Sequence, residues 1–213
     1  MVAVNQKNAF CRLTKVSRET LVKFEIFEKL IKYNNKKMNL ISKSTVDSIW
    51  ERHFLDSYQV IDFIDKKDNI LTDLGTGAGF PGIVTALIAK DRKFKLKIRL
   101  IEKSKKKINF LNLVINKLSL NAETINENIF ETRNMLTGDI FSARAFKPIE
   151  KILELIHKKA NNWNKILIFL GKTGKEDLVQ ASKNWDIQYK ERTSITSNDS
   201  VILEINKLKK KIY

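Results

Sequence analysis

Four of the seven glycines in this chain lie within the ten residues D-L-G-T-G-A-G-F-P-G, at positions 73–82. The apolar segment I-L-T-D-L leads into this stretch, and G-I-V-T-A-L-I-A-K continues it with the composition of a helix. Glycine adopts positive φ without strain and lets a ligand approach the backbone closely. A strand, a glycine-rich turn and a helix in this order are typical of an α/β fold whose ligand lies beyond the strand ends.

The rest of the chain after residue 67 alternates between strand-like and helix-like patterns. Strands are predicted at residues 70–74, 97–102, 122–128, 139–145, 165–170, 187–195 and 200–206, and helices at residues 82–90, 104–120, 148–160 and 175–185. Alternation of this kind indicates a parallel sheet with right-handed crossovers. The last two strands have no helix between them and should form an antiparallel hairpin. We therefore predict an α/β fold, Rossmann-like and of the class I methyltransferase type, with a mostly parallel seven-stranded sheet; a dinucleotide-binding domain more often ends on another parallel strand.

Two amphipathic helices are predicted before the first strand. Residues 17–33 place apolar side chains at helical spacing behind Ser17, a plausible N-cap, and residues 45–64 repeat the pattern. We expect an N-terminal helical cap over residues 1–66 and the sheet-containing domain over residues 67–213. With only two prolines and seven glycines, the chain offers little material for a flexible linker, so the two should form one compact unit.

The charge of the chain favours a polyanionic partner. Forty basic residues against 24 acidic ones give a net charge of +16, and such an excess favours nucleic acid. Because 32 of the basic residues are lysine and 8 are arginine, an AT-rich coding bias is an alternative explanation. Cys11 is the only cysteine, which excludes an internal disulfide framework and favours a cytoplasmic, reducing location. No apolar run is long enough to span a membrane, two histidines and one thiol are too few for a metal site, and we expect a monomer.

The glycine stretch fits two cofactor registers. Gly77, Gly79 and Gly82 match G-x-G-x-x-G, the dinucleotide fingerprint, whereas Gly75, Gly77 and Gly79 match D-x-G-x-G-x-G behind Asp73. A carboxylate at Asp73 would oppose a pyrophosphate and would suit a cationic ligand such as the amino-acid portion of S-adenosylmethionine. A tight turn that binds no ligand is the third interpretation.

An acidic residue ends the second predicted strand. Glu102 ends the segment R-L-I-E, 23 residues beyond Gly79, a spacing suited to accepting hydrogen bonds from both ribose hydroxyls. This position does not separate the two cofactors, because both carry an adenosine ribose. The alternative is a surface acid paired with Lys103 or Lys105.

Further polar candidates lie outside the glycine stretch. His53 and Asp56 share a helix face, as do Arg52 and Asp56, which allows either an imidazole steered by a carboxylate or a local ion pair. Arg144 ends the fourth strand and could hold a carboxylate or phosphate in its fork, or form a surface salt bridge. Residues 171–175, G-K-T-G-K, lack the full spacing of a P-loop but could bind an anionic substrate.

Five segments together carry a family resemblance: M-N-L-I-S, E-R-H-F-L-D-S, D-L-G-T-G-A-G-F-P-G-I, R-L-I-E with S-K-K-K-I-N-F-L, and S-A-R-A-F. In this order they resemble the bacterial 16S rRNA guanine-N7 methyltransferase family (RsmG, glucose-inhibited division protein B) from about residue 39 onwards. The resemblance implies S-adenosylmethionine as cofactor, and 16S rRNA or the 30S particle as substrate. It also implies cofactor contacts from these residues: Gly75, Phe80, Glu102, Ile129, Phe130 and Arg144.

The implied reaction requires little acid–base catalysis by the protein. Guanine N7 has an in-plane lone pair, so no proton must leave before it attacks, and a general base is not required. We assign Arg52, His53 and Arg144 to substrate positioning, and Asp56 or Phe80 to stabilising the cationic product. Leu170 stands where the family often has lysine, and Lys172 is a possible substitute. An NAD-type oxidoreductase, a methyltransferase acting on another substrate and a non-catalytic RNA-binding protein remain alternatives.

Overall fold

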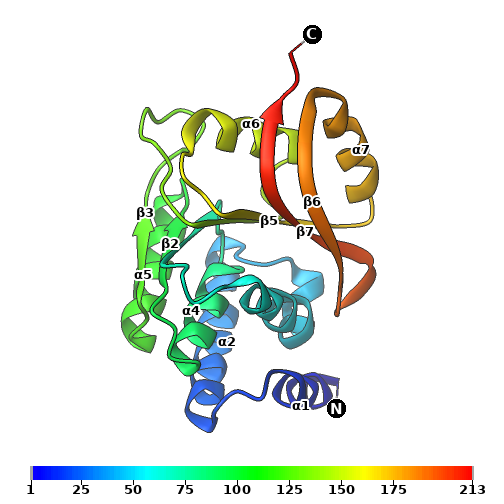
Figure 1. Ribbon diagram of the computed structural model, residues 1–213. Coiled ribbons are helices and arrows are strands. Elements are labelled where there is room, and N and C mark those ends of the chain that lie inside the picture. The colour runs from blue at the N-terminus through cyan, green and yellow to red at the C-terminus, as the bar shows by residue number, and fades with distance from the viewer. Residues whose placement is uncertain (1, 213) are drawn as a thin grey trace.

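Seven strands form a single sheet within residues 2–212, the part of the chain that the computed structural model describes (Figure 1). The strands are β1 (Ile70–Leu74), β2 (Lys97–Ile101), β3 (Ala122–Ile125), β4 (Ile140–Arg144), β5 (Lys165–Leu170), β6 (Trp185–Ser194) and β7 (Ser197–Lys210), in the order β3-β2-β1-β4-β5-β7-β6. The first five pair in parallel, and β7 pairs antiparallel with β5 and β6. The predicted sheet and its terminal hairpin are confirmed, although β3 ends at residue 125 instead of 128.

The order of the strands places the site. From β1 the sheet extends through β2 and β3 on one side and through β4 and β5 on the other, so the carboxyl ends of β1 and β4 are neighbours. This is the switch point at which open α/β sheets bind ligands. The glycine-rich stretch follows β1 directly and therefore lies at this point.

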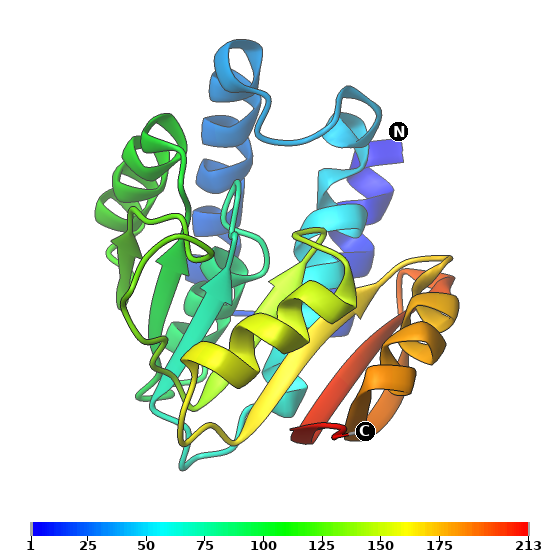
Figure 2. The ribbon, with the colours of Figure 1, turned by 90° about the horizontal axis from the view of Figure 1, so that it is seen from above.

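Helices cover both faces of the sheet (Figure 2). The helices α4 (Gly82–Asp91) and α5 (Lys105–Leu118) lie on the same face as the N-terminal helices, and α6 (Ile149–Lys159) and α7 (Gly174–Asn184) lie on the opposite face. Gly82 is the first residue of α4, and a Cβ added there would come within 2.2 Å of Leu100. Gly82 therefore serves the close packing of α4 on the sheet.

The N-terminal region contains more helix than the sequence pattern predicts. The helix α1 (Val2–Thr14) was not predicted, whereas α2 (Arg18–Met38) begins as expected behind Ser17, whose hydroxyl accepts a hydrogen bond from the Thr20 amide at 3.2 Å. Residues 45–64 were predicted as one regular helix. The structure instead has four short helical segments: η1 (Lys43–Ser48), η2 (Trp50–Leu55), α3 (Asp56–Tyr58) and η3 (Gln59–Phe63).

The segment η2 has π-helical geometry, with the Asp56 amide donating to the carbonyl of Glu51. A π-turn adds a residue to the helical repeat and re-aims the side chains around it, and such turns are frequent at functional sites. Arg52 and His53 lie within this turn.

The N-terminal helices and the sheet share one apolar core. Phe10, Phe24 and Phe54 belong to the same buried cluster as Leu71 of β1 and Ile83 of α4. A second cluster on the other face joins α6, α7 and the terminal hairpin to the sheet. The N-terminal helices therefore pack onto the sheet through continuous apolar contacts.

Candidate functional site

The turn after β1 depends on glycine at three positions. Gly75, Gly77 and Gly79 have φ values of +66°, +60° and +98°, a region that other residues rarely adopt. A Cβ on Gly75 would lie 2.0 Å from the Phe146 ring, and one on Gly79 would lie 2.4 Å from Ile83. A Cβ on Gly77 would meet no atom closer than the Gly75 carbonyl oxygen at 3.9 Å, so the space beside Gly77 is open.

The Asp73 side chain holds this turn in place through hydrogen bonds. Its side chain is fully buried and accepts hydrogen bonds from the Thr76 hydroxyl at 2.6 Å, the Gly82 amide at 2.9 Å and the Ser142 hydroxyl at 3.0 Å. Burial raises the pKa of this carboxyl to about 6, against the lowering effect of those bonds. The structure therefore places Asp73 as a support of the turn, although the sequence suggested a direct contact with a cationic ligand.

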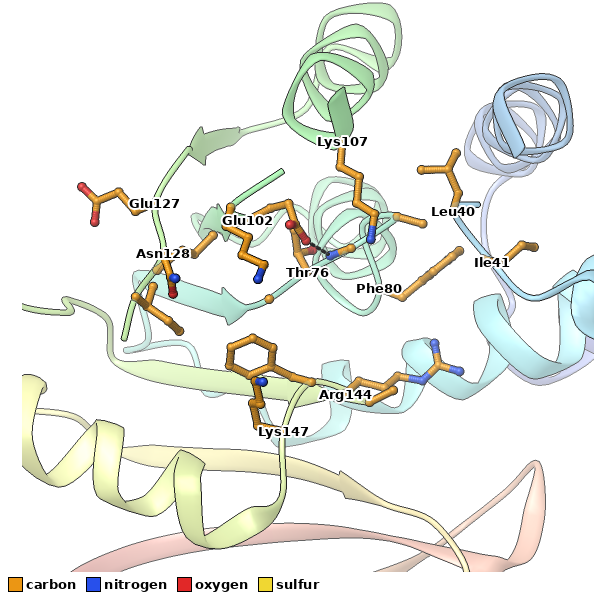
Figure 3. A pocket seen from close by; sticks show the side chains of 18 of the residues that line it. Leu40, Ile41, Thr76, Phe80, Glu102, Lys107, Glu127, Asn128, Arg144 and Lys147 are labelled. Atoms are coloured by element: carbon orange, nitrogen blue, oxygen red, sulfur yellow. Dashed lines mark hydrogen bonds between the residues drawn. The ribbon is translucent and has the colours of Figure 1, made fainter. Parts of the chain in front are cut away.

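The turn borders a cavity of about 890 Å³ at the carboxyl edge of the sheet. In Figure 3 the cavity runs between two groups of side chains: Glu102, Glu127 and Asn128 at one end, and Leu40, Ile41, Phe80 and Arg144 at the other. Of the predicted site residues, those that line it are His53, Gly75, Gly77, Phe80, Glu102, Ile129, Phe130 and Arg144. Asp73, Gly79 and Arg52 are not on its wall.

Glu102 connects the glycine turn to the end of β2. Its carboxylate, 8% exposed, accepts hydrogen bonds from the Gly77 amide at 3.2 Å and the Ser104 amide at 2.8 Å. Within residues 2–212 it forms no ion pair with Lys103 or Lys105. The carboxylate is therefore held at the cavity by backbone donors, with oxygen lone pairs left for a ligand.

An aromatic pair closes the side of the cavity beyond β3 and β4. The rings of Phe130 and Phe146 stack with centroids 5.8 Å apart, and the Lys147 ammonium lies 5.9 Å from the Phe130 ring. Phe130 is 40% exposed, whereas Ile129 beside it is buried. Sequence reasoning missed Phe146, which packs into the space left by the absent side chain of Gly75.

Arg144 is the most highly connected side chain at the opposite end. Its Nε pairs with the Asp56 carboxylate at 2.9 Å, Nη1 lies 3.3 Å from His53 Nδ1, and Nη2 donates to the Arg52 carbonyl at 2.6 Å. Its guanidinium also lies 5.9 Å from the Phe80 ring. Burial lowers the pKa of Arg144, and the Asp56 carboxylate acts in the opposite direction. The guanidinium group of Arg144, which was expected to bind a ligand, is thus engaged largely by groups of the protein itself.

His53 is neutral and has a defined tautomer. Burial, with Arg144 and Arg52 nearby, lowers its pKa to about 3. Because Nδ1 accepts from the Arg144 guanidinium, the ring proton lies on Nε2, which donates to the Thr45 hydroxyl at 2.9 Å. The imidazole stacks on Phe80 with centroids 4.8 Å apart. A neutral ring in this position can orient neighbours and cannot supply a proton near neutral pH.

Several predicted roles do not match the positions found. Asp56 forms no ion pair with Arg52 within the described residues; its partner is Arg144. Arg52 has an exposed side chain and contributes its carbonyl oxygen. The loop at residues 171–175 does not line the cavity, and Leu170 is buried against Gly174, which gives that loop a packing role.

No group of three or more His, Cys, Asp or Glu side chains among residues 2–212 is placed to hold a metal ion. No helix in that part of the chain is long and apolar enough to cross a membrane.

Residues 20–206 match the model of one protein family, described as rRNA small subunit methyltransferase G (GidB). The chain is 44% identical over 198 residues to ribosomal RNA small subunit methyltransferase G of Pelagibacter ubique, covering 92% of each chain. It is 37% identical over 196 residues to the enzyme of the same name from Rickettsia akari, covering 92% of this chain and 98% of the relative.

Solved structures resemble the chain in fold at lower sequence identity. A SAM-dependent methyltransferase from Aquifex aeolicus has a TM-score of 0.55 and 19% identity, and covers 74% of this chain and 92% of that one. TrmK of M. capricolum, solved with S-adenosyl-homocysteine, has a TM-score of 0.52 and 21% identity, and covers 70% of this chain and 66% of that one. The fold is that of class I methyltransferases.

Proposed function

This chain belongs to the rRNA small subunit methyltransferase G family, and from that premise we propose that it methylates N7 of a guanine in 16S rRNA, with S-adenosylmethionine as the methyl donor. The observation that carries the proposal is the coincidence of sequence family and site. Each of the five segments that carry the family resemblance contributes residues to the wall of one cavity, which lies at the switch point of a methyltransferase fold.

The cavity end formed by β1, β2 and the residues after β3 fits the cofactor. The open space beside Gly77 lets a ligand contact the backbone, and the Glu102 carboxylate is available to ribose hydroxyls. Ile101 and Ile129 provide apolar walls for an adenine ring. When bound, S-adenosylmethionine supplies a methyl group that moves from sulfur to guanine N7 as the carbon–sulfur bond breaks.

The other cavity end fits a purine base. Leu40, Ile41 and Phe80 form its apolar wall, and Thr45 and His53 add polar groups. Alignment of the attacking atom and the methyl group is the main demand of the reaction, because N7 carries no proton to remove. The wall side chains hold the base in place and exclude water. Asp56, which sequence reasoning offered as a partner of the cationic product, is committed to Arg144 and does not line the cavity; Phe80 does.

Lysines contribute to the cavity wall. Lys103, Lys107, Lys147 and Lys151 all line the cavity, in a chain of net charge +16. Their ammonium groups suit the phosphates that flank a target nucleotide, because phosphate contacts position a nucleic acid without reading its sequence.

The dinucleotide alternative has little support from the geometry. Close packing of Gly82 on Leu100 fits either register, because the third glycine of a dinucleotide fingerprint also serves helix–strand packing. The Asp73 carboxylate, however, binds the Gly82 amide at the start of α4 and would oppose a pyrophosphate there.

Further points are part of the proposal. We propose that the enzyme acts as a monomer in the cytoplasm, on 16S rRNA or on the 30S particle that contains it. We also propose that residues 1–66 and 67–213 act as one compact unit, a view supported by their shared core.

Transfer of labelled methyl groups tests the function. Purified protein should label 16S rRNA or 30S particles from cells that lack the gene, and cleavage at N7-methylguanine should map one nucleotide. Titration calorimetry should detect S-adenosylhomocysteine binding. Tight NAD binding without S-adenosylhomocysteine binding would contradict the proposal, and cofactor binding without labelling would favour a non-catalytic RNA-binding protein.

A further inference from the structure

The Asp56 carboxylate joins three segments that are far apart in the sequence. It lies at the start of α3, Arg144 ends β4, and Ser194 and Thr196 belong to the turn between β6 and β7. That turn lies at the end of the hairpin nearer the N-terminal helices (Figure 1).

Each oxygen of Asp56 has its own set of donors. Oδ2 pairs with Arg144 Nε at 2.9 Å. Oδ1 accepts from the Thr196 hydroxyl at 2.8 Å, the Ser194 hydroxyl at 3.1 Å and Gln59 Nε2 at 3.3 Å. The carboxylate is thus held from the hairpin side and presents its other oxygen to Arg144.

The side-chain amide of Gln59 forms a second set of hydrogen bonds to the same turn. Its Nε2 donates to the Ser194 hydroxyl at 3.0 Å, and its Oε1 accepts from the Ile195 amide at 2.9 Å. Gln59 is fully buried and Ser194 is 5% exposed. Hydrogen bonds in such a shielded place are stronger than exposed ones, and leaving one unmade is costly.

Arg144 connects Asp56 to the wall of the cavity. An arginine held at Nε by a carboxylate has a fixed fork, and this fork fixes His53 through Nδ1 and lies beside Phe80. Both His53 and Phe80 line the cavity, whereas Asp56, Ser194 and Thr196 do not.

We propose that Asp56 is a positioning residue for methyl transfer. Held by Ser194 and Thr196 of the β6–β7 turn, it fixes the position of the Arg144 side chain. Arg144 in turn fixes the orientation and tautomer of His53 at the base-binding end of the cavity. The terminal hairpin is then part of the active-site support. This inference rests on the proposed function for its kinetic readout, but not for its spectroscopic one.

The test is Asp56→Asn, which keeps the shape and removes the charge. We expect kcat for 16S rRNA to fall about 100-fold, as misplacement of a reacting group by about an ångström does. S-adenosylhomocysteine affinity should change less than about threefold, because Asp56 does not line the cavity and its side-chain partners are Arg144, Gln59 and residues of the β6–β7 turn. The ring ¹⁵N signals of His53 should also lose the pattern of a fixed Nε2–H tautomer.

Asp62→Asn is the matched control. Asp62 of η3 pairs with Arg192 of β6 at 2.7 Å, so it joins the same two regions through an exposed ion pair that does not touch Arg144. Such a pair contributes little, and this variant should keep both kcat and the His53 signals.

A second variant separates positioning from folding. Ser194→Ala with Thr196→Val removes two of the three donors to Oδ1, keeps Gln59 and leaves Asp56 charged, and we expect kcat to fall about tenfold with a smaller change in the His53 signals. Wild-type kcat and His53 signals in folded Asp56→Asn would overturn the inference, and if that variant does not fold, unchanged values in the double variant would do so. If the wild-type protein never labels rRNA, the proposed function fails, and the His53 signals alone then decide about Asp56.

Discussion

The two ends of the cavity are built in different ways. The cofactor end consists of the glycine turn, which follows β1 directly, and Glu102 after β2, and its key groups are backbone amides. The base end joins Thr45, His53, Asp56 and Arg144 through side chains, and its support extends to the β6–β7 turn. The first end therefore has a geometry set by local chain conformation, and the second has one set by tertiary packing.

This difference predicts different responses to substitution. A change at the cofactor end should alter cofactor affinity, because the backbone itself is the binding surface. A change at the base end should alter turnover and leave cofactor affinity nearly constant. Single substitutions at each end can therefore show whether the two ends work independently.

The largest effect is expected at Gly77. A valine there must adopt a φ near +60° and would place its side chain in the open space of the cavity. We expect S-adenosylhomocysteine affinity to fall more than about 100-fold in calorimetry, with the protein still folded by circular dichroism, because no buried neighbour is displaced.

Gly171→Val is the control for Gly77→Val. A Cβ at Gly171 meets nothing within 4 Å, its φ is not in the left-handed region, and it does not line the cavity. Normal affinity in both variants would mean that the cofactor does not approach the glycine turn.

The next effect is expected for Arg144→Lys at the base end. Lysine keeps a positive charge but cannot contact Asp56, His53 and the Arg52 carbonyl at the same time. Steady-state kinetics should show kcat lower by about 100-fold with cofactor affinity within about threefold. Arg192→Lys, which alters an exposed ion pair, should be near normal; equal loss of cofactor affinity and turnover at Arg144 would show that the two ends are not separate.

A smaller effect is expected for Glu102→Gln. The amide can still accept one backbone hydrogen bond, but its NH₂ group opposes the second donor among Gly77 and Ser104 and weakens ribose recognition. S-adenosylhomocysteine affinity should fall about tenfold in calorimetry, as expected for the loss of a charge-assisted hydrogen bond. Glu123→Gln, on the neighbouring strand β3 but in an exposed ion-pair cluster, should change affinity little; a similar loss there would point to long-range charge.

The same contrast explains what the sequence could predict. Periodicity identified the sheet, and the spacing of Asp73, the glycines and Glu102 indicated the turn that borders the cavity, because those residues are positioned by a strand, a turn and a helix in succession. No pattern linked Asp56 to Arg144 or to Ser194, since contacts across such separations depend on the packed fold. The π-helical turn at Arg52 and His53 also has no reliable sequence signal, and the pairing of Asp56 with Arg144 instead of Arg52 was therefore not predicted.

The smallest effect is expected in the pH dependence of stability. The contributions of Asp73, at the cofactor end, and of His53, at the base end, to the free energy of unfolding change with pH in opposite directions. Burial raises the pKa of Asp73 from 3.8 to about 6, so the folded state binds more protons between these values and the Asp73 contribution to stability falls as pH rises. Burial, followed by Arg144 and Arg52, lowers the pKa of His53 from 6.5 to about 3, so the unfolded state binds more protons and the His53 contribution is lost as pH falls from 6.5 towards 3.

Urea unfolding between pH 4 and pH 6 separates the two contributions. In His53→Gln the free energy of unfolding should rise less steeply with pH than in the wild type, and in Asp73→Asn more steeply, each by up to about 1 kcal/mol per pH unit, since one proton corresponds to roughly 1.4 kcal/mol per unit. Slopes that change in the same direction in both variants would contradict the opposite shifts. The opposition has a physical origin: buried Asp73 is surrounded by neutral donors that do not fully replace water, whereas His53 adjoins a permanent cation whose own counterion is Asp56. The base end therefore holds its charge as the Arg144–Asp56 ion pair, and the imidazole beside this pair is neutral near neutral pH.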